Sequence, residues 1–302
     1  MYYYSLNEYL KNTFGEKVYK ISLNGGMTCP NRDGTLSDKG CIFCSKGGSG
    51  EFSADSNLSI TQQIDEAKKR VQNKTKTDKY IAYFQAFTNT YADVNYLEKI
   101  FYEAINKEEI VALSIATRPD CLGEDVLDLL SRLSKIKPVW IELGLQTIHK
   151  KSANYIRRCY DLPIYENAVK ELKSRGITVI THIILGLPGE TEKEMLETVE
   201  YVGKYTDGIK LQLLHVLKGT DLAEEYEKGQ FEVLSLEEYV NILCKAIELL
   251  PENVVIHRLT GDGDKKLLIA PLWSGDKKRV LNTINKAFRE KNVIQGSNTE
   301  IK

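Results

Sequence analysis

The chain has 302 residues, of which 42% are hydrophobic, and its formal net charge is −1. This length and apolar content allow one large α/β domain with an ample core, and the near-neutral charge excludes a generally basic nucleic-acid-binding protein. The first residues contain no basic segment followed by an apolar run, and no stretch approaches the ~18 apolar residues of a membrane span. We therefore expect a cytoplasmic protein that makes no membrane contact.

Six short apolar segments, rich in β-branched and aromatic residues, alternate with amphipathic segments along the chain. They have the composition of parallel strands that are covered on both faces. The six segments are residues 18–23, 80–86, 110–116, 139–145, 177–185 and 209–214. Capping boxes at Ser59, Thr191 and Ser235 mark the starts of three intervening helices. This alternation predicts an α/β fold, a partial (β/α)6 TIM-like barrel with its site at the C-terminal ends of the strands.

The pattern changes after the sixth predicted strand. Residues 254–259 predict an additional strand at the open side of the barrel, and residues 277–288 predict a terminal helix. We expect residues 1–250 to form the barrel with its N-terminal cysteine loop, and residues 251–302 to form an extension that caps it.

Three cysteines follow the first predicted strand in a glycine-rich loop. Eleven residues separate Cys29 from Cys41, and two separate Cys41 from Cys44. Three thiolates on a four-iron cluster leave one iron with an open coordination position that a substrate or cofactor can fill. Structural zinc is the alternative, but it needs a fourth ligand, and all four histidines lie more than a hundred residues downstream. The spacing therefore favours an iron–sulfur cluster.

The other three cysteines, Cys121, Cys159 and Cys244, are too scattered to form a second metal site. We expect them to be buried thiols.

Polar side chains gather where the predicted strands end. Phe43 lies in the cysteine turn, where it can contact a flat ring bound at the open iron, although an ordinary buried aromatic residue is an equal alternative. Neutral donors and acceptors of the kind that hold an ammonium group follow the second strand, and Thr117 and Gln146 end the third and fourth strands. The residues after the second strand are Gln85, Thr88 and Asn89.

The three cysteines, together with the joint Gly186-Leu187-Pro188-Gly189 after the fifth strand, resemble the radical S-adenosylmethionine (SAM) superfamily over residues 18–260. The run 117–120 is similar to the catalytic subunit of elongator. The run 144–146, with Arg158 twelve residues after Gln146, is similar to oxygen-independent coproporphyrinogen oxidases.

This resemblance implies a [4Fe–4S] cluster held by the three loop cysteines, with SAM bound at the open iron. Gln146 and Arg158 would hold the polar ends of SAM, because the guanidinium fork suits a carboxylate. His182 occupies the position of an acidic ribose contact in the coproporphyrinogen oxidases. The chain departs from the commonest superfamily pattern, which has three residues between the first two cysteines, and it lacks an evident Gly-Gly-Glu motif at the second strand, where Gln85, Thr88 and Asn89 would substitute.

Longer motifs resemble a bacterial radical SAM group, the YtqA-like or MnmL family, at residues 29–34, 40–44, 83–91 and 257–262. That resemblance implies conversion of a carboxymethylaminomethyl group to an aminomethyl group at C5 of the tRNA wobble uridine. It also implies tRNA as a partner and a reducing electron donor such as flavodoxin or ferredoxin.

Six residues are candidates to bind substrate, with a surface or core role as the alternative for each: His215, Lys218, His257, Arg258, Asp262 and Lys265. The basic runs Lys150-Lys151 and Lys277-Lys278-Arg279 are candidates for tRNA contacts. Two other functions stay open at this point, a radical SAM enzyme acting on a small molecule such as a tetrapyrrole and a non-catalytic metal-binding module.

Overall fold

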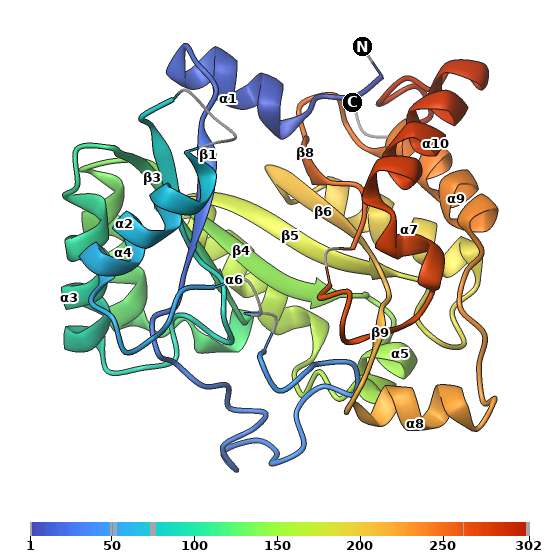
Figure 1. The fold of residues 1–302 in the computed structure, drawn as a ribbon, viewed down its shortest axis with the longest axis horizontal. Helices are drawn as coiled ribbons and strands as arrows, with labels where there is room; N and C mark the ends of the chain where they lie inside the picture. The colour runs from blue at the N-terminus through green and yellow to red at the C-terminus, as the bar shows by residue number, and fades with distance from the viewer. Residues whose placement is uncertain (1, 49, 51–52, 73–76, 262, 300–302) are drawn as a thin grey trace.

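The computed structural model describes residues 2–48, 50, 53–72, 77–261 and 263–299. Its centre is a curled sheet of seven parallel strands in the order β1-β2-β3-β4-β5-β6-β8 (Figure 1). The strands are β1 (Tyr19–Leu23), β2 (Tyr80–Phe84), β3 (Ile110–Thr117), β4 (Val139–Gln146), β5 (Thr178–Leu185), β6 (Gly208–Leu213) and β8 (Val255–Arg258). The predicted half-barrel fold is confirmed, and the additional strand lies beside β6 as expected.

Helices follow most of the strands and cover the outside of the sheet (Figure 1). They are α1 (Leu6–Phe14), α2 (Ile60–Val71), α3 (Val94–Ile105), α4 (Glu124–Ser134), α5 (Lys150–Tyr155), α6 (Leu162–Ser174), α7 (Glu192–Gly203), α8 (Asp221–Glu227), α9 (Leu236–Leu249) and α10 (Lys277–Glu290). The three predicted capping boxes are present at the starts of α2, α7 and α9. In the part of the chain that the structure describes, no helix has the length and apolar character needed to cross a membrane.

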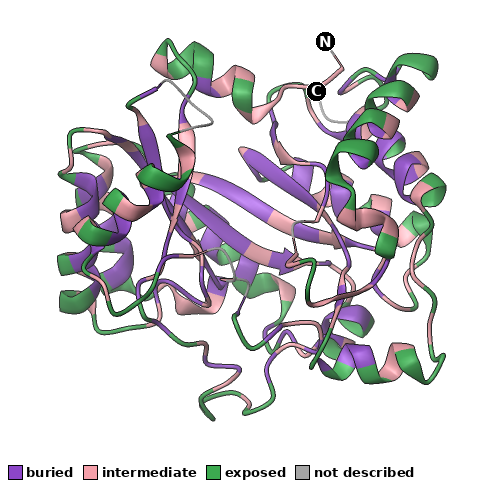
Figure 2. Cartoon of the chain, in the orientation of Figure 1, coloured by how far each residue is buried: buried purple, intermediate pink, exposed green. Residues whose placement is uncertain are grey.

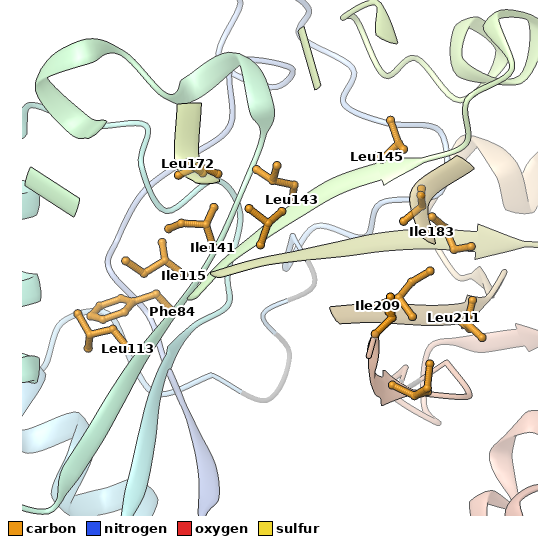
Figure 3. Close-up of a cluster of buried hydrophobic side chains, with 14 of the residues drawn as sticks. Phe84, Leu113, Ile115, Ile141, Leu143, Leu145, Leu172, Ile183, Ile209 and Leu211 are labelled. Atoms are coloured by element: carbon orange, nitrogen blue, oxygen red, sulfur yellow. The ribbon is translucent and has the colours of Figure 1, made fainter. Parts of the chain in front are cut away.

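The strands are apolar on the face that meets the helices. Side chains such as Phe84, Ile141 and Leu211 point from alternate strand positions into one large core, and the strands are buried almost throughout (Figures 2 and 3). Alternation follows from the two-residue period of a strand, which sends successive side chains to opposite faces.

The opposite face lines the bore of the half-barrel, and its N-terminal end is closed by apolar side chains. Leu10 of α1 lies there in one apolar cluster with side chains that come from, or directly precede, five of the strands. These are Val18, Ile81, Ala112, Trp140 and Ile180. Access to the bore is therefore from the C-terminal ends of the strands.

Residues after 250 complete the sheet with β8 and pair β9 (Leu268–Ala270) with β7 (Val216–Leu217) in an antiparallel ribbon. They continue into α10, which packs against α9, and the segment after α10 returns to the N-terminal residues, where the Gln295 N–H donates to the Tyr2 carbonyl (3.0 Å). The division of the chain at residue 250 stays a prediction.

Candidate functional site

A cavity of about 260 Å³ lies at the C-terminal ends of the strands. Twelve of the residues expected from the sequence line it: Cys29, Cys41, Phe43, Cys44, Gln85, Thr88, Thr117, Gln146, Arg158, His182, His215 and Arg258. Residues far apart in the sequence thus meet in one place, as expected for a site built from βα loops.

Five candidates are not among them. The Asn89 amide is fully buried and donates to the carbonyls of Phe84 (3.1 Å) and Ala116 (2.9 Å), so it ties two strand ends together. The half-buried His257 packs its ring edge-on against Trp140, with 5.8 Å between the ring centres. Lys218 and Lys265 are exposed outside the cavity, and Asp262 lies outside the described residues.

Arg32 holds the cysteine loop in shape. Its Nη2 donates to the carbonyls of Cys44 (2.7 Å) and Ser45 (2.5 Å), which draws the two ends of the loop together. The guanidinium carbon also lies 5.7 Å from the centre of the Phe87 ring. Gly40 has a φ of +75°, and a Cβ there would lie 3.0 Å from Arg32 Nε, so glycine allows this close approach.

Ile42 anchors the turn between the two nearer cysteines. It is buried in an apolar cluster at the cavity mouth, and its backbone bonds to the Ile156 carbonyl (3.3 Å) and the Leu222 N–H (3.0 Å). Asn31 is also buried, and its Nδ2 donates to Cys41 Sγ (3.5 Å) and to the Arg157 carbonyl (2.6 Å). These contacts hold the part of the loop that carries Cys41 against the residues around the cavity.

The backbone is strained beside the cavity. Phe87 and Gln146, which line it, and Arg157 and Cys159, which flank Arg158, have positive φ angles of 58°, 66°, 57° and 63°. Such conformations cost non-glycine residues on the order of 1 kcal/mol or more and persist where surrounding contacts enforce them. The strain at residues 157 and 159 accompanies an inward-pointing Arg158.

Arg158 is buried and its guanidinium is bound to the backbone. Nη1 donates to the carbonyls of Leu145 (3.0 Å) and Thr147 (2.6 Å), and Nε donates to Tyr160 (3.0 Å). Its guanidinium lies 4.4 Å from the Tyr160 ring centre, and that of Arg118 lies 5.3 Å from the same centre. Arg118 lines the cavity as well, held by Asp120 through bonds of 2.9 and 2.6 Å.

A network of charged and polar side chains lies at the floor of the cavity, which Glu142, His182 and Lys210 line. Glu142 of β4 is fully buried and accepts bonds from Lys20 Nζ (2.5 Å), Ser114 Oγ (2.5 Å), Lys210 Nζ and His182, whose Nε2 is 2.7 Å away. Sequence analysis did not select Lys20, Glu142 or Lys210. A signal was available, because each of these three residues interrupts an otherwise apolar strand. A charged side chain at such a position is expected to point away from the apolar core.

Burial and mutual charge shift the pKa values in this network. Burial lowers the pKa of His182 to about 4, with a further contribution from Lys210, so the ring is neutral at pH 7. Burial also lowers the pKa of Lys210 to about 7. Although burial acts in the opposite direction, Lys20 and Lys210 hold the pKa of Glu142 well below its usual value.

The three loop cysteines line one cavity, which gives it the thiolate donors that an iron–sulfur cluster uses. Among the residues that can be described, no three His, Cys, Asp or Glu side chains are grouped so that they could hold a single metal ion. A cluster does not require such a group, because each thiolate binds a different iron.

Of the remaining cysteines, Cys244 is buried as expected, whereas Cys121 is half-buried and Cys159 is exposed. The expectation of buried thiols is therefore wrong for Cys159, which directly follows the inward-pointing Arg158, and only partly met by Cys121.

The neutral state of His182 predicts a pH-dependent stability. Its pKa falls from 6.5 to about 4 on folding, so the unfolded chain binds the proton first and stability falls as pH decreases below 6.5. Between pH 7 and pH 5 this group should remove about 2 kcal/mol from the free energy of unfolding. His182→Gln should lose less stability over that interval than the wild type in urea titrations. Equal losses would contradict the assigned pKa.

Family models match most of the chain. The radical SAM superfamily model matches residues 29–202, and the radical SAM C-terminal domain model matches residues 206–290. YtqA of Bacillus subtilis (strain 168) is 45% identical over 97% of this chain and 92% of its own length. The tRNA uridine(34) acetyltransferase of Methanocaldococcus jannaschii is 29% identical over 61% of this chain and 34% of its own length.

The fold is also similar to a solved structure. The archaeal Elp3 of Methanocaldococcus infernus superposes with a TM-score of 0.69 at 19% identity, over 92% of this chain and 64% of that one. Together with the matching models, these findings show that the chain belongs to the radical SAM superfamily of enzymes, which use a [4Fe–4S] cluster and SAM.

Proposed function

We propose that this radical SAM enzyme modifies the C5 side chain of the tRNA wobble uridine, converting a carboxymethylaminomethyl group to an aminomethyl group. In the balanced reaction the two carboxymethyl carbons leave as glyoxylate, water supplies the aldehyde oxygen, and cleavage of SAM to methionine and 5′-deoxyadenosine takes up two electrons and one proton. One observation supports the proposed binding of the cluster and SAM: a single cavity is lined by the three cysteines, Gln146 and Arg158. The similarity to a tRNA uridine(34) acetyltransferase supports the substrate. This chain spans only about a third of that relative, so acetyl transfer is not included.

Cys29, Cys41 and Cys44 would hold the cluster, which supplies an electron that cleaves SAM to methionine and a 5′-deoxyadenosyl radical able to abstract a substrate hydrogen. Flavodoxin or ferredoxin would deliver the electron, and the cytoplasm provides both the carrier and tRNA. The three cysteines line the cavity, and Arg32, Asn31 and Ile42 hold their loop.

Arg158 and Gln146 would bind the polar ends of SAM. The carbonyls of Leu145, Thr147 and Tyr160 take the Nη1 and Nε hydrogens and fix the plane of the guanidinium. A carboxylate would therefore be received by Nη2, with little further loss of side-chain freedom. Thr117 is likewise held, because its Oγ1 lies 2.6 Å from Thr90 Oγ1. Phe43, Gln85 and Thr88 would complete the contacts to SAM.

The surrounding chain would restrict water. Apolar side chains close the N-terminal end of the bore, and Gly261 and Gly263 after β8 contribute to the cavity wall. A reactive radical requires such enclosure, since water and stray C–H bonds compete with the substrate.

The cluster assignment predicts a division among the six cysteines. Replacing Cys29, Cys41 or Cys44 with Ala should abolish the iron–sulfur absorption near ~400 nm and the cleavage of SAM, because each removes one iron ligand. Cys121→Ala, Cys159→Ala and Cys244→Ala are the matched controls and should retain both. Loss of bound iron in a control variant would contradict the assignment.

The substrate assignment predicts a change in cellular tRNA. In a strain from which the gene is deleted, nucleoside analysis should show carboxymethylaminomethyluridine accumulating at the wobble position and aminomethyluridine disappearing, because the conversion is blocked. Restoring the wild-type gene, but not Cys41→Ala, should reverse the change. A normal nucleoside profile would contradict the tRNA proposal.

The exposed basic run Lys277-Lys278-Arg279 begins α10, beside a shallow groove lined by Asp276, Lys278, Arg279, Asn282, Thr283 and Lys286. Lys150 and Lys151 of α5 are exposed as well. Arg158, which follows Lys151 by seven residues, is buried and therefore does not contribute to this exposed basic surface. We infer that tRNA phosphates contact the two exposed runs.

These contacts predict salt-sensitive tRNA binding, because phosphate contacts release counterions. Affinity should fall several-fold on replacing Lys277 and Lys278 with Glu, and SAM cleavage without tRNA should be unchanged. The matched control replaces the exposed Lys11 and Lys17 at the closed end of the barrel with Glu. Salt-independent binding, or equal effects of the two double variants, would favour a small-molecule substrate.

A further inference from the structure

The side chain of Asn31 lies fully buried beside the thiol of Cys41. Its Nδ2 donates one hydrogen bond to the Arg157 carbonyl (2.6 Å) and another to Cys41 Sγ (3.5 Å). The short bond to a carbonyl fixes which end of the amide is the donor, because a carbonyl oxygen can only accept. The amide nitrogen, and not Oδ1, therefore faces the sulfur.

The backbone of the cysteine loop holds Asn31 at this position. The Asn31 carbonyl accepts from the Gly40 N–H (2.6 Å), which joins it to the residue directly before Cys41. The Cys29 carbonyl accepts from the Arg32 N–H (2.8 Å), in a tight turn that contains Asn31. These two bonds bring the beginning and the end of the long segment between Cys29 and Cys41 together, so that a short side chain reaches from one cysteine to the next.

The oxygen of the same amide gains nothing from this burial. Within the described residues, Oδ1 of Asn31 is buried and has no hydrogen-bond partner. An unpaired buried acceptor costs free energy, and a leucine of similar size would avoid that cost. The same leucine would lose both bonds from Nδ2. The amide is therefore accounted for by its two N–H groups, one of which ends on a proposed iron ligand.

We propose that Asn31 is a positioning residue that raises the reduction potential of the cluster through its N–H···S bond to Cys41. The inference rests on the proposed function, because Cys41 must be one of the three iron ligands. A cluster that takes up one electron becomes more negative, so an N–H group directed at a ligand sulfur stabilises the reduced form more than the oxidised form.

The electron would come from reduced flavodoxin or ferredoxin, which is oxidised by one electron, and no proton needs to move. Asn31 would make this transfer more favourable without binding iron or SAM itself. Burial strengthens the effect, because an N–H dipole acts over a lower dielectric inside the protein than in water.

The first test measures the midpoint potential of the cluster without SAM, by a redox titration followed by electron paramagnetic resonance. Asn31→Leu keeps a side chain of similar size and removes both N–H groups. Its midpoint potential should lie about 59 mV below that of the wild type, which is a ten-fold change in a one-electron equilibrium and the size expected for one net hydrogen bond. An unchanged potential with full iron content would overturn the proposal.

Ile42→Val is the matched control. It removes one methylene from the buried anchor of the same loop and leaves the Asn31 amide in place, so its midpoint potential should equal that of the wild type. A purely structural role for Asn31 predicts a different result for Asn31→Leu. Loss of the bond to Arg157 would then lower the iron content, while the clusters that remain keep the wild-type potential, and this outcome would also count against the proposal.

The second test needs no substitution. Wild-type protein is made with asparagine that carries ¹⁵N in its side-chain amide alone, and the cluster is reduced without SAM. Pulsed electron paramagnetic resonance should then detect a ¹⁵N coupling, because the N–H···S bond places the amide nitrogen next to a ligand sulfur. The absence of this coupling would overturn the proposal even if Asn31→Leu assembles no cluster.

Cys41→Ala separates this inference from the proposed function. If Cys41→Ala keeps the cluster of the wild type, the assignment of the iron ligands fails and the inference fails with it. If Cys41→Ala loses the cluster, while Asn31→Leu keeps the wild-type potential and the labelled amide shows no coupling, the ligand assignment stands and the role of Asn31 alone is overturned. Neither measurement uses tRNA, so both are independent of the proposed substrate.

Discussion

The buried carboxylate of Glu142 makes it possible to place charge at the centre of this barrel. It receives hydrogen bonds from Lys20 on β1, Ser114 on β3, His182 on β5 and Lys210 on β6. The bonds to β1 and β6 connect β4 with strands that are not its neighbours in the sheet. Since removing one partner of a buried ion pair typically costs about 3–5 kcal/mol, this cross-bore network should contribute to holding the sheet in its curl.

The same strands separate two environments. Their outer side chains form an apolar core with the helices, and their inner side chains change from apolar at the N-terminal end to charged in the middle and polar at the C-terminal end. Figure 3 shows the outer layer, which carries no polar side chain among the labelled residues. The gradient along the bore gives it one open end, and the cysteine loop, the strand ends and the loop after β8 all meet there. The site is therefore a consequence of strand direction as well as of particular residues.

Much of the fold could be predicted from the sequence, because parallel strands and capped helices have local signatures. The apolar runs and the capping boxes at Ser59, Thr191 and Ser235 depend on neighbouring residues only. The charged floor was missed because Lys20, Glu142 and Lys210 each interrupt a different apolar run, and only the closed sheet brings them together. The ribbon of β7 and β9 was missed because two or three residues carry no recognisable period.

Individual side chains were harder to place than elements. Arg158 belongs to a basic run, Arg157-Arg158, yet the two residues differ completely in environment, because Arg157 pairs with Asp221 at the surface while Arg158 turns into the cavity. The positive φ angles around Arg158 produce this reversal, and they are enforced by tertiary contacts that no local pattern encodes. Asn89 shows the opposite case, since a polar residue at a strand end serves to join two backbones.

The cysteine loop, at which we propose that the cluster binds, illustrates how a metal site can be prepared by residues that do not bind metal. Its long segment between Cys29 and Cys41 has no helix or strand, so its shape depends on the Arg32 bonds to Cys44 and Ser45, the buried Ile42 and the Asn31 amide. Small zinc domains, in contrast, fold only when the metal supplies that energy. Because these contacts already gather the thiols on a barrel with its own large core, cluster binding need not drive folding here. The contacts made by the cluster would then contribute to its affinity and would not have to offset the cost of folding, and the iron without a protein ligand would stay open to SAM.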